Sequence, residues 1–159
     1  MSVENKTSVP LSQLEVLQEL EGIMTGQWIT DLATTAAILF QHVTDINWVG
    51  FYLTDTAGKV LWLGPFQGLP ACTLIPFAKG VCGTSAQTKQ SMLVLDVDLF
   101  PGHIVCDSRS RSEVVVPLIS EQKVIGVLDV DSATTARFTK TDLLFFENVV
   151  KILLQKNKL

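Results

Sequence analysis

The sequence predicts one α+β domain, with an antiparallel sheet and with helices gathered near both ends of the chain. Apolar residues recur at helical spacing over residues 11–40 and again over residues 139–153, whereas the segments between them have the short, turn-bounded pattern of strands. Several of these strands follow each other through tight turns, which favours hairpins over parallel crossovers. We expect the helices to share one face of the sheet, and residues 1–159 to form this single domain.

Composition narrows the classes of function. Hydrophobic residues make up 47% of the chain and charged residues 18%, which excludes a disordered protein. The 12 basic and 16 acidic residues leave a net charge of −4, so we expect neither a nucleic-acid partner nor an anionic membrane. No apolar run is long enough to span a bilayer, and residues 1–6 lack the pattern of a secretion signal. We therefore expect a cytoplasmic protein whose partner is a small molecule or another protein.

Three long helices are predicted, over residues 11–23, residues 28–40 and residues 139–153. The first two are separated by a break at Thr25 and Gly26. The outer two begin with a capping box, in which a hydroxyl residue and an acid three positions later bond each other's backbone. These pairs are Ser12 with Glu15, and Thr139 with Asp142.

A β-hairpin is predicted next. Residues 47–54 and 60–64 are rich in aromatic and branched side chains, and the turn between them contains Gly58, which can adopt a positive φ. We expect the second strand to end at Gly64, because Pro65 follows it and a second proline stands at position 70.

A short strand and a short helix are predicted after this hairpin. Residues 72–77 are apolar, and the glycine-flanked residues 80–86 are expected to open a helix. That helix start would place Cys82 near free backbone N–H groups and the positive end of the helix dipole. Such a setting lowers the pKa of a thiol from about 8.5.

A fourth apolar strand is predicted at residues 92–95, and a long irregular connection follows it over residues 96–111. Long loops often carry functional residues. Five side chains in this one could take part in chemistry, although spacing leaves the role of the histidine open: His103, Cys106, Asp107, Arg109 and Arg111.

A second hairpin is predicted from residues 113–119 and 124–131. With a turn near residue 121, position 113 lies opposite about position 129, so Glu113, Asp129 and Asp131 should meet at one end of the sheet. Asp129 and Asp131 share a face of the strand, and their repulsion should raise the pKa of at least one acid if the site is partly buried. A carboxyl group kept neutral in this way could donate a proton. For an isolated Asp at a strand end, simple solvation is the plainer interpretation.

The three cysteines, Cys72, Cys82 and Cys106, are an odd number in a chain expected to be in a reducing compartment, which argues against permanent structural disulfides. Any one of them alone would most simply be a small buried hydrophobe. Loop geometry could nevertheless bring all three together. Zinc bound by the three thiols and His103 is chemically feasible, but no Cys-x-x-Cys pair supports it, so we expect no metal.

Seven short runs together form a recognisable pattern: NWVGFY at residues 47–52, GPFQG at 64–68, ACTLIPF at 71–77, GVCGT at 80–84, FPGHIVCDS at 100–108, SEVVVP at 112–117 and GVLDVDS at 126–132. With them the sequence resembles the free methionine-(R)-sulfoxide reductases, enzymes built on a GAF domain. The resemblance extends from about the second helix to the last. The two cysteine-containing motifs together are specific for this family rather than for GAF domains in general.

The resemblance implies a GAF fold, with a six-stranded, mainly antiparallel sheet, helices on one face and the ligand enclosed under loops on the other. It implies reduction of free L-methionine (R)-sulfoxide to L-methionine. By motif position Cys106 resembles the catalytic nucleophile, Cys82 the principal resolving cysteine and Cys72 an accessory one that can also form a disulfide. The positions that match the family's acidic substrate-site residues and its aromatic walls are Glu113, Asp129 and Asp131, and Trp48 and Tyr52.

These roles form a consistent chemical hypothesis. The thiolate of Cys106 would attack the sulfoxide sulfur, while a neutral carboxyl among the three acids protonates the departing oxygen. The resulting sulfenic acid would condense with Cys82 to form a disulfide. An external dithiol protein such as thioredoxin, itself reduced with electrons from NADPH, would reduce this disulfide. No bound cofactor is therefore expected. Carboxylates could also pair with the ammonium group of a free amino acid, which a peptide-bound residue lacks. Spacing does not say which acid donates.

Two other functions remain as alternatives. A GAF sensor would bind a small ligand such as a cyclic nucleotide, although no output domain follows Leu159. A redox-regulated interaction protein would use its cysteines only as a switch. The exposed first helix and the similarity to the family also make a homodimer a reasonable expectation.

Overall fold

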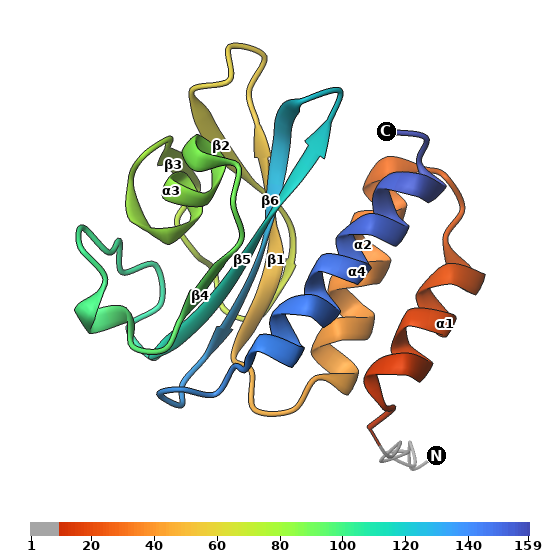
Figure 1. Cartoon of the computed structure of the whole chain (residues 1–159), viewed down its shortest axis with the longest axis horizontal. Helices are drawn as coiled ribbons and strands as arrows, with labels where there is room; N and C mark the ends of the chain where they lie inside the picture. The colour runs from red at the N-terminus through yellow and green to blue at the C-terminus, as the bar shows by residue number, and fades with distance from the viewer. Residues whose placement is uncertain (1–9) are drawn as a thin grey trace, which may run out of the picture.

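A computed structural model describes residues 10–159, and its framework is a six-stranded sheet in the order β3-β2-β1-β6-β5-β4 (Figure 1). All neighbouring strands pair antiparallel, which confirms the predicted α+β class. Residues 1–9, which include the segment considered for a secretion signal, lie outside the described residues. The strands are β1 (Trp48–Thr54), β2 (Val60–Gln67), β3 (Leu74–Pro76), β4 (Met92–Val94), β5 (Ser112–Ser120) and β6 (Lys123–Ser132).

Three long helices lie on one side of the sheet (Figure 1): α1 (Gln13–Ile23), α2 (Trp28–His42) and α4 (Lys140–Lys156). Helices α2 and α4 pack directly on the strands, and α1 packs against these two helices. Both predicted capping boxes are present, one at Ser12 and the other at Thr139. In the described part of the chain, no helix has the length and apolar character needed to cross a membrane.

The sheet separates two apolar cores, because successive side chains of a strand point to opposite faces. On the helix side, Phe51, Val114 and Leu128 belong to a core built with α1, α2 and α4. On the other side, Tyr52 and Val115 belong to a second core, which is covered by loops and by a short helix. The site described below lies on this second side.

The short helix α3 (Gly80–Thr88) corrects the expectation that all helices share one face, since it lies on the side opposite α1, α2 and α4 (Figure 1). The strand order gives the reason. Strands β3 and β4 are at opposite edges of the sheet, so the chain between them must cross one face. The long helices occupy the other face, and α3 forms part of this crossing.

Strand β2 is longer than predicted and continues through Pro65 to Gln67. The pairing with β1 shifts between Gly50 and Tyr52, where Gly64 and Pro65 of β2 form a bulge opposite Phe51. The neighbouring strand β3 pairs only with residues 60–62 of β2. Pro65 therefore stands where the ladder is already irregular and where no N–H is needed, as prolines within sheets generally do.

The second hairpin has a register two residues away from the predicted one. Glu113 pairs with Asp131, and Asp129 pairs with Val115. The turn is centred between Glu121 and Gln122, not on residue 121, and a further shift occurs at a bulge after Leu118. These two displacements add, and together they bring Glu113 directly opposite Asp131.

Candidate active site

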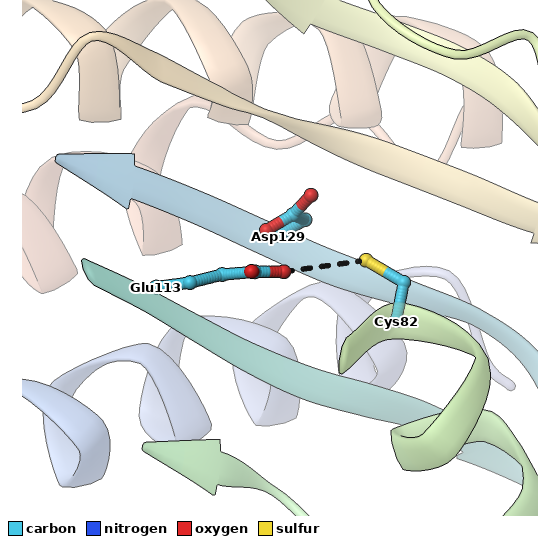
Figure 2. A group of neighbouring side chains, drawn as sticks. All are labelled: Cys82, Glu113 and Asp129. Carbon is cyan, nitrogen blue, oxygen red and sulfur yellow. Dashed lines mark hydrogen bonds between the residues drawn. The ribbon is translucent and has the colours of Figure 1, made fainter. Parts of the chain in front are cut away.

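Three acids gather at one end of the second face, as the sequence predicted. Strands β5 and β6 place Glu113, Asp129 and Asp131 on the side away from the long helices, and the first two are each only 6% exposed. Cys82 approaches them from α3, and its thiol donates a hydrogen bond to Glu113 Oε1 over 3.9 Å. Figure 2 shows the side chains of Cys82, Glu113 and Asp129 converging from these three elements.

Burial raises the pKa of all three acids, but the size of the shift differs among them. It raises the pKa of Glu113 well above its usual value, and the charge of Asp129 adds to the effect. Burial and the charge of Asp129 also raise the pKa of Asp131 well above its usual value. Burial also raises the pKa of Asp129, but hydrogen bonds from Cys82 and Glu113 oppose the rise and hold it at about 6. Asp129 is therefore the acid of the three that most readily ionises, whereas the shifts of Glu113 and Asp131 favour their neutral forms. The expectation that the pKa of at least one of these acids is raised is confirmed.

The thiol of Cys82 does not have the lowered pKa expected from its place at a helix start. Burial raises the pKa well above the usual value, and the nearby charge of Asp129 raises it further. The side chain is only 3% exposed and faces acids, so the cost of burying a thiolate there outweighs the favourable end of α3. In this state Cys82 is a neutral thiol that donates a hydrogen bond.

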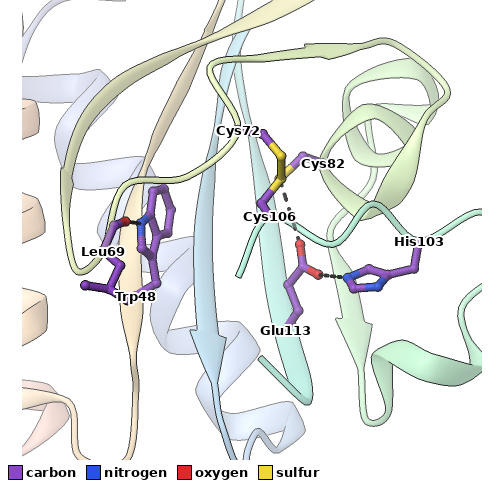
Figure 3. The surroundings of a disulfide bond; sticks show 7 residues. All are labelled: Trp48, Leu69, Cys72, Cys82, His103, Cys106 and Glu113. Carbon is purple, nitrogen blue, oxygen red and sulfur yellow. Dashed lines mark hydrogen bonds and ion pairs between the residues drawn. A yellow bond between two sulfur atoms is a disulfide. The ribbon is translucent and has the colours of Figure 1, made fainter. Parts of the chain in front are cut away.

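The one disulfide in the described chain joins Cys72 to Cys106 and leaves Cys82 as a free thiol (Figure 3). Cys106 is thus bonded to the cysteine expected to be accessory, and not to the expected principal resolving cysteine. Cys82 lines the same small cavity as Cys106 and so remains its neighbour. Cys72 and Cys106 are half-buried, whereas Cys82 is buried, so the disulfide is the part of the cluster that lies nearer to solvent.

His103 is a site residue whose role could not be assigned from the sequence. Its Nε2 lies 3.9 Å from Glu113 Oε2, and burial lowers the pKa of the imidazole (Figure 3). It reaches the acid cluster from the loop that carries Cys106. Nothing in the local sequence pattern could reveal this approach, because it depends on how the loop folds back over the sheet.

A polar network fastens that loop to the sheet. The side-chain amide of Asn47 donates to Asp107 Oδ2 at 3.1 Å and to Ser110 Oγ at 3.2 Å. A bond from the Arg109 guanidinium, with others from the Arg109 backbone and Asn47, keeps the pKa of Asp107 at about 2 despite partial burial. Ser110 in turn bonds Asp131. Sequence reasoning missed Asn47 and Ser110, since residues so far apart in the chain share no local signal.

The cavity between these groups is small in this disulfide form. Its volume of about 30 Å³ suits a water molecule and is too small for an amino acid. The lining includes the three acids, Cys82, Cys106 and His103, with the exposed Lys79 at its margin.

The two expected aromatic walls lie on the same face but beside this cavity. Trp48 stacks on Tyr52 and on Phe66, with ring centroids 5.8 Å and 5.5 Å apart. The Trp48 Nε1–H donates to the carbonyl of Leu69 at 3.0 Å, which ties the segment before Cys72 to β1 (Figure 3). Burial and the neighbouring charge of Asp129 raise the pKa of the Tyr52 phenol.

The fold and the enclosed face beneath loops define the class of protein. A family model described as GAF domain matches residues 29–153. The chain is 41% identical to the free methionine-R-sulfoxide reductase of Saccharomyces cerevisiae over 155 residues, which cover 90% of this chain and 86% of that protein. It is 46% identical to the Escherichia coli free methionine-R-sulfoxide reductase over 127 residues, 79% of this chain and 76% of that protein.

Solved structures agree with these relatives. The free methionine-R-sulfoxide reductase of Neisseria meningitidis, determined in complex with its substrate, has a TM-score of 0.90 at 44% identity and covers 95% of this chain and 94% of its own. The reduced form of fRMsr of Staphylococcus aureus has a TM-score of 0.88 at 40% identity and covers 99% of both chains. The chain belongs to the GAF-domain family of free methionine-R-sulfoxide reductases.

Proposed function

We propose that this protein reduces free L-methionine (R)-sulfoxide to L-methionine at the acid cluster beside Cys106. The observation that carries the proposal is that Cys106, bonded to Cys72, lines the same cavity as Glu113 and Asp131, two carboxyl groups whose pKa is raised. Sulfoxide reduction needs both, a sulfur that can be oxidised and an acid that can protonate the departing oxygen. The substrate named for the Neisseria meningitidis relative supports the choice of a free amino acid.

The first step starts from the reduced enzyme. The thiolate of Cys106 attacks the sulfoxide sulfur, and a proton from Glu113 or Asp131 passes to the oxygen. The sulfur–oxygen bond of the substrate breaks, and the hydroxyl is transferred to Cys106. Methionine is released with its sulfur reduced by two electrons, and Cys106 is left as the sulfenic acid, oxidised by two.

The second step removes the sulfenic acid. A thiol condenses with Cys106, which releases water and forms a disulfide. We propose Cys82 as the thiol that condenses first, because it lines the same cavity, and Cys72 as the thiol that then exchanges onto Cys106. The Cys72–Cys106 bond would be the species passed to the reductant, since it is less buried than Cys82. Thioredoxin, kept reduced with NADPH, is the proposed reductant, and no bound cofactor is required.

Substrate selection follows from the charge of the cluster. The ionised Asp129 is proposed to pair with the ammonium group of the substrate, and a peptide-bound methionine sulfoxide would leave this charge without a partner. Because the present cavity is too small for an amino acid, reduction of Cys72–Cys106 is proposed to open the loop over the site. Trp48 and Tyr52 would then form the wall of the widened pocket.

We also propose an oligomeric state and a location for the protein. The outer helical layer exposes apolar side chains, with Leu14 at 65% and Ile29 at 60%, and a homodimer through this layer would cover them. The cytoplasm is the proposed location, because the cycle needs a compartment that regenerates thiols.

The proposed function is tested with resolved R and S epimers of methionine sulfoxide, each supplied both as the free amino acid and as its N-acetyl derivative. Thioredoxin, its reductase and NADPH complete the assay. We expect NADPH consumption and methionine formation with the free R epimer alone. Equal turnover of the N-acetyl compound would contradict the role of Asp129, and consumption without methionine would contradict the reaction.

A further inference from the structure

One sulfur and two carboxyl oxygens converge at the cavity that Cys106 also lines. The Cys82 sulfur and one carboxylate oxygen each from Glu113 and Asp129 all lie within 4.8 Å of one another (Figure 2). The three residues are 3%, 6% and 6% exposed. They come from three separate elements, α3, β5 and β6, so the fold itself brings them together.

One atom of this group has no partner. Asp129 Oδ1 is buried and receives no hydrogen bond from any described residue. A buried acceptor without a partner is costly, and each such case calls for an explanation.

Another buried aspartate in the same protein shows the usual arrangement. The carboxylate of Asp31 receives bonds from the Thr25 N–H and hydroxyl, the Gly26 N–H and the Asn157 amide, at 2.8 to 2.9 Å. The Asp129 Oδ1 atom lacks such donors although its side chain belongs to a buried group of three ligand-type residues, and a bound cation would give it a partner.

The donor set favours one class of cation. A thiolate with two carboxylates matches the ligands of Zn²⁺, whereas Ca²⁺ and Mg²⁺ require more oxygen ligands and avoid sulfur. Around a tetrahedral zinc, a sulfur and an oxygen ligand are about 3.5 Å apart. The Cys82 sulfur and Glu113 Oε1 are 3.9 Å apart, close to this distance, and because the three ligand atoms lie within 4.8 Å of one another the group would contract around an ion. A cavity of about 30 Å³ also has room for an ion and its water, but not for an amino acid.

We propose that the protein with the Cys72–Cys106 disulfide intact binds one divalent cation of the zinc class through Cys82, Glu113 and Asp129, with water as the fourth ligand. Binding replaces the protons of the Cys82 thiol and the Glu113 carboxyl with two metal bonds and releases them to solvent. The site does not depend on the proposed reaction, because its ligands are present whether or not the protein turns over a sulfoxide.

Cobalt(II) is a suitable probe, because it replaces zinc and reports its ligands by absorption. Oxidised protein is titrated with Co²⁺, and free thiol is counted beforehand to confirm that only Cys82 remains reduced. We expect saturation at one equivalent, visible bands typical of four-coordinate cobalt, and a sulfur-to-cobalt charge-transfer band in the near ultraviolet. Because Cys82 is the sole free thiol, that band reports its coordination directly. Added Zn²⁺ should remove the bands, and Mg²⁺ should not.

Variants distinguish coordination of cobalt at this site from nonspecific attraction of the cation by nearby acidic residues. Cys82→Ser should remove the charge-transfer band, and Asp129→Asn should weaken cobalt binding at least tenfold. Asp131→Asn is the matched control, since this acid lies two residues along the same strand but outside the three-residue group. It should bind cobalt within about twofold of the parent. Circular dichroism checks that each variant is folded.

Three outcomes would overturn the inference. They are absence of the charge-transfer band in the parent protein, its persistence in Cys82→Ser, and an equal loss of binding in Asp131→Asn and Asp129→Asn. The last would mean that negative charge alone attracts the ion. None of these outcomes bears on methionine formation, so the proposed function stands or falls separately.

Discussion

At the scale of single residues, the aspartates of this protein show how surroundings decide chemistry. Asp107 is ionised and held at a pKa of about 2, mainly by hydrogen bonds from Arg109. Asp129, buried among other acids, has a pKa of about 6. Asp131 is raised further, since burial and its acidic neighbours both oppose its charge. The pKa of one residue type is thus lowered at Asp107 and raised at Asp129 and Asp131 within a single group of side chains.

The nucleophile is tested by single turnover. Because the sulfur of Cys106 receives the oxygen in the proposed reaction, Cys106→Ser should form no methionine above the blank when reduced protein meets substrate without a reductant. Cys82→Ser should still form methionine once, but should recycle poorly with thioredoxin. Methionine is measured by mass spectrometry. Normal yield from Cys106→Ser would remove its nucleophilic role, and full recycling by Cys82→Ser would assign resolution to Cys72.

The pH dependence should report Asp129. Its pKa in the folded protein is about 6, so the anion proposed to bind the substrate ammonium is lost as the pH falls through this value. We expect kcat/KM to fall about tenfold for each pH unit below about 6. In Asp129→Asn this acidic limb should disappear and kcat/KM should be low throughout. An unchanged limb in the variant would assign the titration to another group.

At the scale of elements, features with local causes could be predicted and features with distant causes could not. The capping boxes at Ser12 and Thr139 and both hairpins follow from nearby residues, and the acids at the ends of β5 and β6 follow from the hairpin. The placement of α3 follows from the strand order, which no local pattern encodes. The contacts of Asn47 and His103 depend on the conformation of a long loop, so no local sequence pattern could predict them.

Close packing of α3 offers a test at this scale. A Cβ added at Gly83 would collide with the carbonyl oxygen of Pro76. Gly83→Ala should therefore shift α3, lower the free energy of unfolding by about 1–3 kcal/mol and reduce activity by moving Cys82. Gly22→Ala is the matched control, because nothing lies within 4 Å of the added atom on α1. It should stabilise the protein by about 0.5–1 kcal/mol. Denaturant unfolding of both variants gives the comparison.

At the scale of the whole molecule, the sheet separates the main hydrophobic core on one face from the candidate active site on the other. The larger core lies with the long helices, and the site lies on the other face. Asp31 belongs to the first side, where its carboxylate joins the turn between α1 and α2 to Asn157 beyond α4. Although burial opposes its charge, the hydrogen bonds from Thr25, Asn157 and Gly26 leave its pKa lowered.

This division predicts that stability and activity can be changed separately. Asp31→Ala should lower the free energy of unfolding by about 2–4 kcal/mol, because buried donors lose a charged partner. Its kcat/KM, measured well below the melting temperature, should stay within about twofold of the parent. The stabilisation by Asp31 should be present above its unfolded pKa of 3.8 and be lost as the pH falls through its lower folded value. An equal pH dependence of unfolding in parent and variant would contradict this.

The path from β3 to β4 also limits how far this protein can be shortened. The two strands are opposite margins of the sheet, so the backbone between residues 77 and 91 acts as a fixed-length tether across its width. If a turn of α3 were deleted, the shortened connection could no longer reach between β3 and β4. One of these edge strands would then lose its backbone hydrogen bonds to the sheet. Insertions, by contrast, would only lengthen the loop that covers the face with the candidate site. Natural length variation in this segment should therefore run towards longer chains.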